Sequence, residues 1–193
     1  GAPVVNAAEE DWSRLLPAIR NTPGVRVITL NHPRDLHSGF VPFEAETFDA
    51  QTGTLQNIPT NAQGNASPAA KPDTNAPRID AIEVITSGAM QSDIGLLFRD
   101  WFALLNHGHR IAAIAASDTH DVSRFILGQG RTYVAANDSD PGNLPLEDIW
   151  KSYQSGKLLV SLGLFVNLRV DGRFGVGALA TGLGETVEVE ATV

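Results

Sequence analysis

The sequence predicts an α/β protein in which a parallel sheet or barrel is followed by a short antiparallel β extension. Up to residue 155, short segments rich in β-branched residues alternate with amphipathic segments of helical period, which is typical of parallel α/β folds. After Gly156 the hydrophobic period becomes two, and no helical segment separates the strands, which is typical of antiparallel sheets. We therefore expect an α/β unit over residues 1–155 and the start of a β-rich module over residues 156–193.

The first part of the chain is predicted to contain a helix, a strand and a long insertion. Ala8–Arg20 carries apolar residues at helical spacing, and Val25–Leu30 (VRVITL) is rich in β-branched residues that favour a strand. Phe40–Phe48 has no clean period and is interpreted as a short helix. Gln51–Pro77 contains almost no large apolar residue, which predicts a loosely ordered surface insertion, either a tolerated loop or a lid over a nearby site.

Regular elements resume at residue 80 and continue to the end of the chain. Ser92 is the expected N-cap of a strongly amphipathic helix that ends at Gly108, and Pro145 and Gly156 are expected to bound a second helix. The expected strands are Asp80–Thr86, Ile111–Ala116, Thr132–Ala136, Lys157–Ser161, Leu164–Val170 and Glu185–Val193, with a helical turn or two over Asp121–Gly128 and a turn at Asp171–Gly175.

Composition excludes several classes of function. The net charge is -8 and the 14 Lys and Arg residues are scattered, so we expect no nucleic-acid partner. No apolar run reaches the ~18–20 residues of a membrane span. The chain has no cysteine, which rules out disulfides and thiolate ligands, so a metal would have to be bound by histidine and carboxylate. The compartment stays open, and a periplasmic or secreted location is compatible with the composition.

Polar residues follow two predicted strands at their carboxyl ends. His32 comes directly after Val25–Leu30, and Asp118 and His120 come after Ile111–Ala116. Glu83 lies within the strand between them, where a carboxylate flanked by apolar residues needs a cationic or hydrogen-bonding partner. Ligands and metals gather at the carboxyl ends of strands in α/β sheets and barrels, so we expect these side chains to lie together.

This residue set suits a hydrolytic metal site. Imidazole with carboxylate and no thiolate is the ligand mix for Zn, Mn or Fe. Residues i and i+2 of an extended loop point the same way, so Asp118 and His120 can share one ion or bridge two, while Ser117 and Thr119 face away. In the alternative interpretation, the Asp-Thr-His sequence caps a following helix and His32-Pro forms a turn.

Three further histidines are interpreted differently. His107 and His109 lie at the end of a predicted helix, where cations interact favourably with the helix dipole. His37, five residues after His32, stays open as a candidate, although the pattern favours a loop histidine that faces solvent.

Several segments, taken in order, resemble the PHP (polymerase and histidinol phosphatase) superfamily. They are VITLNHPRD, DAIEVITSG, DWFALLNHGHRIAAIAASDTHD and GRTYVAA, and they are most similar to the carbaryl-hydrolase-type metallohydrolases of the CehA/McbA branch. The later SGKLLVSLGLFVNLRVDGRFG resembles the β module that follows the PHP domain in that branch. The resemblance runs from about Val25 to Gly175 and omits the insertion.

The resemblance implies a distorted seven-stranded β/α barrel with a di- or trinuclear metal site. It assigns His32 to the third family motif, and Asp118 and His120 to the fourth, as metal ligands. Glu83 occupies a site-lining position and is a further candidate metal ligand. Arg131 is a candidate catalytic residue that would hold an anionic or carbonyl oxygen of the substrate, with a structural salt bridge as the alternative.

Part of the family's ligand set is missing. The H-x-H of the first motif is absent, as are the histidine and glutamate that should follow it, and residues 1–24 contain no histidine. The chain is therefore predicted to be the C-terminal portion of a PHP-like barrel with an incomplete divalent-metal site. The leading hypothesis is a parent protein that hydrolyses small-molecule phosphoesters or related esters. The alternatives are a non-catalytic scaffold or binding module of an envelope or carbohydrate-associated protein, and a domain that self-associates to complete its barrel.

Overall fold

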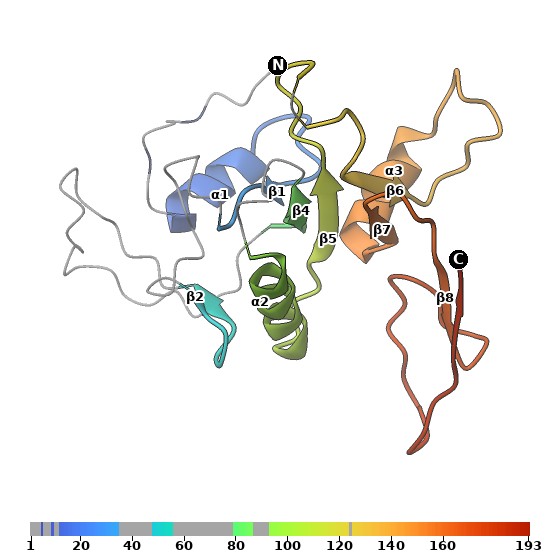
Figure 1. Cartoon of the computed structure of the whole chain (residues 1–193). Coiled ribbons are helices and arrows are strands. Elements are labelled where there is room, and N and C mark those ends of the chain that lie inside the picture. The colour runs from blue at the N-terminus through green and yellow to red at the C-terminus, as the bar shows by residue number, and fades with distance from the viewer. Residues whose placement is uncertain are drawn as a thin grey trace.

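The computed structural model describes Val5, Glu9 and residues 12–34, 48–55, 79–86, 93–123 and 125–193. Within these ranges the protein is a mixed α/β structure of three helices and nine short strands (Figure 1). The helices are α1 (Trp12–Arg20), α2 (Ile94–Asn106) and α3 (Leu146–Ser155). The strands are β1 (Thr29–Leu30), β2 (Phe48–Asp49), β3 (Thr54–Leu55), β4 (Ala81–Thr86), β5 (Ala112–Ala116), β6 (Arg131–Val134), β7 (Leu158–Ser161), β8 (Asn167–Val170) and β9 (Val189–Thr192).

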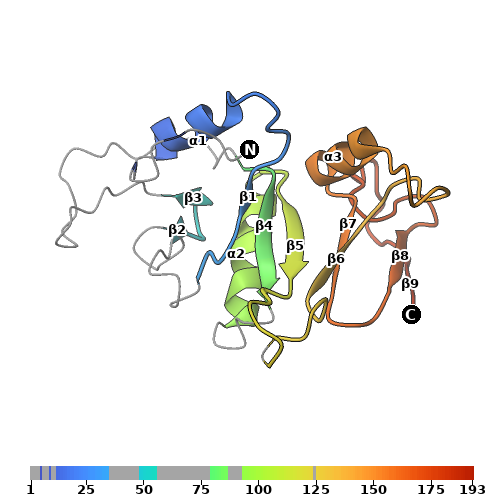
Figure 2. The same cartoon turned by 90° about the horizontal axis from the view of Figure 1, so that it is seen from above.

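A parallel three-stranded sheet in the order β1-β4-β5 forms the centre of the molecule (Figure 2). Leu30 is in register with Ile82, and Ile82 with Ala113, so the carboxyl ends of the three strands meet at one edge. This confirms the predicted α/β class and parallel sheet. The described strands do not close into a barrel, and among them β1 is an outer strand of the sheet.

The two faces of this sheet pack against different helices. One face carries Ile82 and Val84, which belong to the same buried cluster as Leu16 of α1 and Leu104 of α2. The other face carries Ala81, Ala112 and Ile114, which pack with Leu158 and with Tyr153 of α3. Successive strand residues alternate between faces, so Glu83 lies on the second face together with Ala81. Burial on both sides explains why β4 and β5 are nearly continuous apolar runs.

The ends of the helices follow from local capping. Asp93 is the N-cap of α2, and its carboxylate accepts a hydrogen bond from the Leu96 N–H at 3.1 Å, in the place predicted for Ser92. Gly156 ends α3 in the left-handed conformation, as predicted, with φ of 73°. Helix α1 begins at Trp12 rather than at Ala8, because Glu9 is not helical.

Strand β1 is shorter than the predicted Val25–Leu30. The Ile28 N–H donates to Asp80 Oδ2 at 2.7 Å, and Arg20 Nη2 lies 2.7 Å from the same oxygen. The Asp80 carboxylate thus accepts the hydrogen bond that the Ile28 N–H would donate to β4 if the strand were longer. Regular parallel pairing consequently begins only at Thr29.

Two predicted features between residues 40 and 77 are only partly described. Phe48 was assigned to the end of a short helix, which is wrong, because it begins strand β2 and pairs with Leu55 of β3. Asp49 accepts hydrogen bonds from the Gln51 N–H and the Thr52 hydroxyl, and these bonds close the hairpin and lower the pKa of the Asp49 carboxyl. The first residues of the predicted insertion therefore form an ordered hairpin. Residues 40–47 and 56–77 lie outside the described residues.

The predicted helical turn over Asp121–Gly128 is wrong for its described residues. The Asp121 carboxylate accepts bonds from the N–H and hydroxyl of Ser123, and Phe125 has a φ of +57°. Thr119 Oγ1 donates to the Phe125 carbonyl at 2.6 Å. The left-handed conformation of Phe125 interrupts a helix at this point, and the bond from Thr119 fixes the Phe125 carbonyl, so the described residues form an irregular loop.

The C-terminal part consists of antiparallel pairs. β8 pairs with β9, which confirms the predicted antiparallel extension and gives the last strand a partner. β6 was expected to continue a parallel sheet, but it pairs antiparallel with β7. The long connection Ala135–Pro145 between β6 and α3 adds a chain reversal that the strand–helix–strand pattern does not reveal. Because β6 and β7 lie on either side of residue 155, the domain division proposed at that point stays a prediction. Among the described residues, none of the helices is long and apolar enough to cross a membrane.

Candidate functional site

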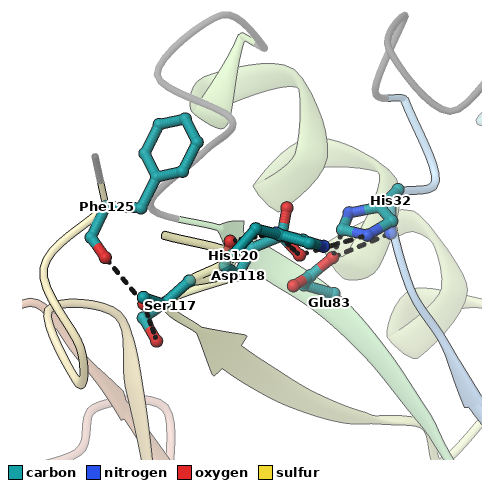
Figure 3. Close-up of polar contacts among 7 residues, drawn as sticks. His32, Glu83, Ser117, Asp118, His120 and Phe125 are labelled. Carbon is teal, nitrogen blue, oxygen red and sulfur yellow. Dashed lines mark hydrogen bonds and ion pairs between the residues drawn. The ribbon is translucent and has the colours of Figure 1, made fainter. Parts of the chain in front are cut away.

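Three neighbouring parallel strands each contribute one polar side chain to the same edge of the central sheet. His32 lies two residues after β1, Glu83 lies in β4, and Asp118 lies two residues after β5. Figure 3 shows their side chains directed toward one another, with His120 beside Asp118. The expectation that the strand order would bring these residues together is therefore confirmed as a matter of position, while their role as metal ligands stays a prediction.

Glu83 is the buried member of this cluster. Its side chain is 2% exposed, and its Oε2 atom accepts a hydrogen bond from the backbone N–H of His32 at 2.8 Å. The same oxygen lies 3.0 Å from Nδ1 of the His32 ring. A buried carboxylate is costly unless it accepts hydrogen bonds, and the donor here is the backbone N–H of His32. The Nδ1 atom is close to the same oxygen but is not aligned to form a hydrogen bond with it.

His32 and Asp118 form the partly open part of the cluster. His32 Nε2 and Asp118 Oδ1 are 3.9 Å apart, and each side chain is 26% exposed. This separation is too long for a hydrogen bond. It is close to the spacing of about 3.4 Å between two ligands that a tetrahedral zinc ion holds at about 2.1 Å each. The separation exceeds this spacing by about 0.5 Å, so an ion bound by both atoms would have to draw them closer together.

His120 lies at the exposed margin of the cluster. Its side chain is 75% exposed, and its Nδ1 atom lies 2.7 Å from the Asp118 carbonyl oxygen and 3.6 Å from Asp118 Oδ1. The ring is thus on the same side of the loop as the Asp118 carboxylate, as the i, i+2 spacing predicted. In this orientation Nδ1 contacts the backbone, so His120 would have to turn its ring to offer that atom to an ion.

The backbone is left-handed at two of these residues. His32 has a φ of 51° and Asp118 a φ of 49°. Such values are uncommon outside glycine and cost about 1–3 kcal/mol each where the surrounding structure enforces them. At both positions the chain leaves a parallel strand and turns sharply, so each turn places its side chain back over the sheet edge (Figure 3).

Ser117 and Thr119 lie on the other side of this loop. Thr119 Oγ1 is 3.0 Å from Ser117 Oγ and also donates to the Phe125 carbonyl. Figure 3 shows Ser117 and Phe125 together and apart from His32 and Glu83. The hydroxyls therefore stabilise the loop that carries Asp118, and the alternative of a capped helix after Asp118 does not apply.

The remaining predicted residues lie elsewhere. Arg131 is exposed at the start of β6, in register with Ser161, and within the described chain no hydrogen bond or ion pair connects its side chain to the cluster. His107 follows α2, and its Nδ1 atom lies 2.8 Å from the Ala103 carbonyl, which fits the predicted helix-end position. His109 is half-buried just beyond it, and His37 lies outside the described residues.

Sequence reasoning missed one ion pair next to the site. Arg34, two residues after His32, contacts Asp100 of α2 through its Nε atom, and Asp100 is 1% exposed. Asp100 lies among the apolar residues of the α2 sequence LLFRDWF. Asp100 directly follows Arg99, but Leu97 and Leu104, three and four residues away, lie on the same face of the helix. This helical spacing from apolar residues is the signal that indicates a buried acid.

The donor set fits part of a metal site and not a complete one. In the described part of the chain, no group of three or more His, Asp and Glu side chains is arranged to hold an ion. His32 Nε2 and the Asp118 carboxylate supply one nitrogen and one oxygen donor, and His120 is the nearest third. Tight binding needs a full ligand set in fixed geometry, so an ion held here would depend on further donors.

Comparison of the chain with protein-family models, with curated proteins and with solved structures finds no match.

Proposed function

We propose that this chain is part of a metal-dependent hydrolase that acts on phosphoesters or related esters. The observation that supports the proposal is the convergence of His32, Glu83 and Asp118 from three adjacent parallel strands at one sheet edge. This is the edge at which α/β proteins place ligands and metals. The resemblance of the same segments to PHP metallohydrolases points to the same chemistry.

In this proposal His32 Nε2, the Asp118 carboxylate and His120 hold a divalent ion, Zn, Mn or Fe. The ion would supply Lewis acidity toward water and toward the scissile ester oxygen. His32 and Asp118 are partly exposed, so a small substrate would reach the site from the solvent side. Arg131, whose side chain is exposed, would reach an anionic or carbonyl oxygen of the substrate only if the parent structure brings β6 closer to the cluster.

The finer architecture belongs to the same proposal. A PHP-type barrel requires strands in addition to the three parallel ones described, and among these described strands β1 is an outer strand at which another strand could pair. The additional strands and ligands would come from another segment of the parent protein or from a second copy of this chain. A solution mass near twice 20.6 kDa would favour the second copy.

Metal binding by the 193-residue chain is the direct test. Zn²⁺ and Mn²⁺ are titrated calorimetrically into the chain, into Asp118→Asn and into the matched control Asp138→Asn, an exposed loop acid. We expect weak 1:1 binding that Asp118→Asn abolishes and Asp138→Asn leaves unchanged. Asparagine tolerates the left-handed backbone of Asp118, so the loss would reflect the missing charge.

Turnover of bis(4-nitrophenyl) phosphate and of 4-nitrophenyl acetate completes the test. We expect little or no turnover by this chain alone, because the donor set is partial. Strong turnover that Asp118→Ala abolishes would contradict the incomplete site but support the reaction class. If Zn²⁺ binding is undetectable, or is identical in Asp118→Asn, the metal proposal is wrong and the scaffold alternative is favoured.

A further inference from the structure

We propose that the outer edge of β9 binds an extended segment of a partner protein whose side chains are alternately apolar and basic. The segment adds a third strand to the two-stranded sheet that β8 and β9 form. Figure 2 shows this sheet at the side of the molecule, beyond β7 and away from α1. The proposed interface includes none of the residues of the cluster formed by His32, Glu83 and Asp118.

The backbone of β9 directs hydrogen-bonding groups toward its outer edge. Val189 lies opposite Val170 of β8, but the Val170 N–H donates to the Phe174 carbonyl at 2.8 Å, and the Val170 carbonyl accepts from the Phe174 N–H at 3.0 Å. Val170 and Val189 are therefore a non-hydrogen-bonded pair of the antiparallel ladder. Backbone groups alternate in direction along a strand, so the N–H and C=O of Val189 and Ala191 point outward. None of the described strands pairs with this edge.

One face of the β8–β9 sheet is apolar and open to solvent. Leu168 lies opposite Ala191 on this face, and Val170 lies opposite Val189. Leu168 is 38% exposed, Val189 is 59% exposed, and all four residues of β9 belong to the exposed class. A two-stranded sheet is at best marginally stable in water and gains stability from a third strand with an apolar face. Apolar side chains of an added strand would extend this face and cover Val189.

The charge of the other face indicates which segment fits. Glu190 lies on this face, and Glu188 precedes it by two residues, the spacing that places side chains on one face of a strand. The Glu188 N–H donates to Asp171 Oδ1 at 2.8 Å, so a third acid lies close by. Arg169 is opposite Glu190, but in the described part of the chain neither glutamate forms an ion pair. Lysine or arginine on the added strand would supply the missing partners.

The same charges oppose pairing with a second copy. Residues 174–193 contain three glutamates and no Lys, Arg or His, so pairing of two β9 strands would gather acids on one face. Like charges across neighbouring strands are destabilising. The strand contains neither the proline nor the lysine that often protects an edge. An edge with free backbone groups that repels its own copy is thus selective for a strand of opposite charge.

Binding of two synthetic peptides to the 193-residue chain tests the inference. The probe is acetyl-Thr-Lys-Val-Lys-Val-Lys-Thr-amide, and in the control peptide glutamate replaces each lysine. ¹H–¹⁵N correlation spectra and amide hydrogen exchange are recorded at low salt, where surface charges are least screened. We expect only the lysine peptide to bind and to slow exchange of the Val189 and Ala191 amides. Absence of binding by this peptide, or binding that leaves both amides unchanged, would overturn the inference.

Variants of the chain separate strand addition from general charge attraction. The double variant Glu188→Gln, Glu190→Gln should weaken binding of the lysine peptide about 2–30-fold. The matched control Asp138→Asn, Glu147→Gln removes two exposed charges elsewhere and should leave the affinity unchanged. Val189→Pro removes an outward N–H without removing a bond to β8, so it should weaken binding as well. Equal affinities in the two double variants would overturn the role of the glutamates, even if the proline variant fails to fold.

Two other occupants of the edge would give different results. Slow exchange of the Val189 and Ala191 amides without peptide, together with a solution mass near twice 20.6 kDa, would show that a second copy pairs with β9. The same protection in a longer parent protein without peptide would show that the parent supplies the strand. Either result would overturn the assignment of this edge to a partner protein.

Discussion

Replacement of Arg34 by methionine should lower the free energy of unfolding by about 3–5 kcal/mol. Arg34 contacts Asp100, whose carboxylate is 1% exposed on helix α2. Without the guanidinium, Asp100 would have to stay charged in a site that excludes water or take up a proton. The expected loss is a large fraction of the total of about 5–15 kcal/mol that is usual for a domain.

Replacement of the other partner, Asp100, should lower the free energy of unfolding by less. In Asp100→Leu the remaining guanidinium belongs to Arg34, whose side chain is 14% exposed and is closer to solvent than Asp100. We expect a loss of about 1–3 kcal/mol for this variant. The double variant should be more stable than Arg34→Met alone, because it contains no unpaired buried charge and replaces the pair by apolar side chains.

Urea unfolding of the four proteins, followed by tryptophan fluorescence, measures the double-mutant cycle. Equal losses in the two single variants, or a double variant that shows the simple sum of both, would refute the reasoning. The cycle also concerns the site, because Arg34 follows His32 by two residues and connects its loop to α2. Loosening of this loop would weaken Zn²⁺ binding in Arg34→Met even under conditions in which the variant is fully folded.

Three further variants test the packing around the site. Thr132→Val should lower the free energy of unfolding in urea by about 1–3 kcal/mol. The reason is that Thr132 Oγ1 accepts a hydrogen bond from the Ala115 N–H at 2.9 Å and donates one to the Ala115 carbonyl at 2.8 Å. Thr132→Ser keeps the hydroxyl and should retain most of the stability. Gly177→Ala should lower the melting temperature more than Gly182→Ala. Both glycines have positive φ, but a Cβ at residue 177 would lie 2.6 Å from the backbone that follows α3, whereas no atom lies within 4 Å of a Cβ at residue 182. Burial raises the pKa of Tyr153 above its ordinary value of 10.0, so its contribution to stability is complete below that pH and is lost as the pH rises through the raised pKa. Urea curves between about pH 9 and about pH 11 should therefore show a smaller loss in Tyr153→Phe than in the unaltered chain.

Each of these predictions has an outcome that contradicts it. If Thr132→Ser were as unstable as the valine variant, the methyl packing rather than the two hydrogen bonds would hold β5 to β6. Equal melting temperatures for the two glycine variants would mean that the backbone after α3 moves freely away from residue 177. Parallel pH profiles for the tyrosine pair would show that the Tyr153 hydroxyl reaches solvent in the folded protein.

The sequence predicted best the elements whose burial leaves a strong pattern. Strands β4 and β5 are covered on both faces, so their sequences are mostly apolar, and α2 shows a clear helical stripe. Elements decided by side-chain bonds to the backbone were not predictable in this way. Asp80 shortens β1 by binding the Ile28 N–H, and Thr119 holds the Phe125 carbonyl in a loop instead of a helix.

The site was predictable to the level of residues but not of atoms. The rule that ligands gather at the carboxyl ends of parallel strands brought His32 and Asp118 together without knowledge of the fold. It does not specify which ring nitrogen faces Glu83, and it gives no distance between Asp118 and the imidazole. Arg131 was named from the resemblance to PHP metallohydrolases and not from this rule, and it lies exposed at the start of β6, which pairs antiparallel with β7.

The backbone conformation at His32 and Asp118 positions their side chains at this edge of the sheet. His32 and Asp118 both adopt left-handed φ values, 51° and 49°, at the ends of strands that are not adjacent in the sheet. Histidine, aspartate and asparagine are the non-glycine residues found most often in this conformation, so the cost at either position is at the low end of about 1–3 kcal/mol. Phe125 and Asp171 adopt the same conformation outside this cluster, with φ of 57° and 50°. What distinguishes His32 and Asp118 is the result of their turns, which bring Nε2 to within 3.9 Å of Oδ1 with Glu83 buried behind the ring.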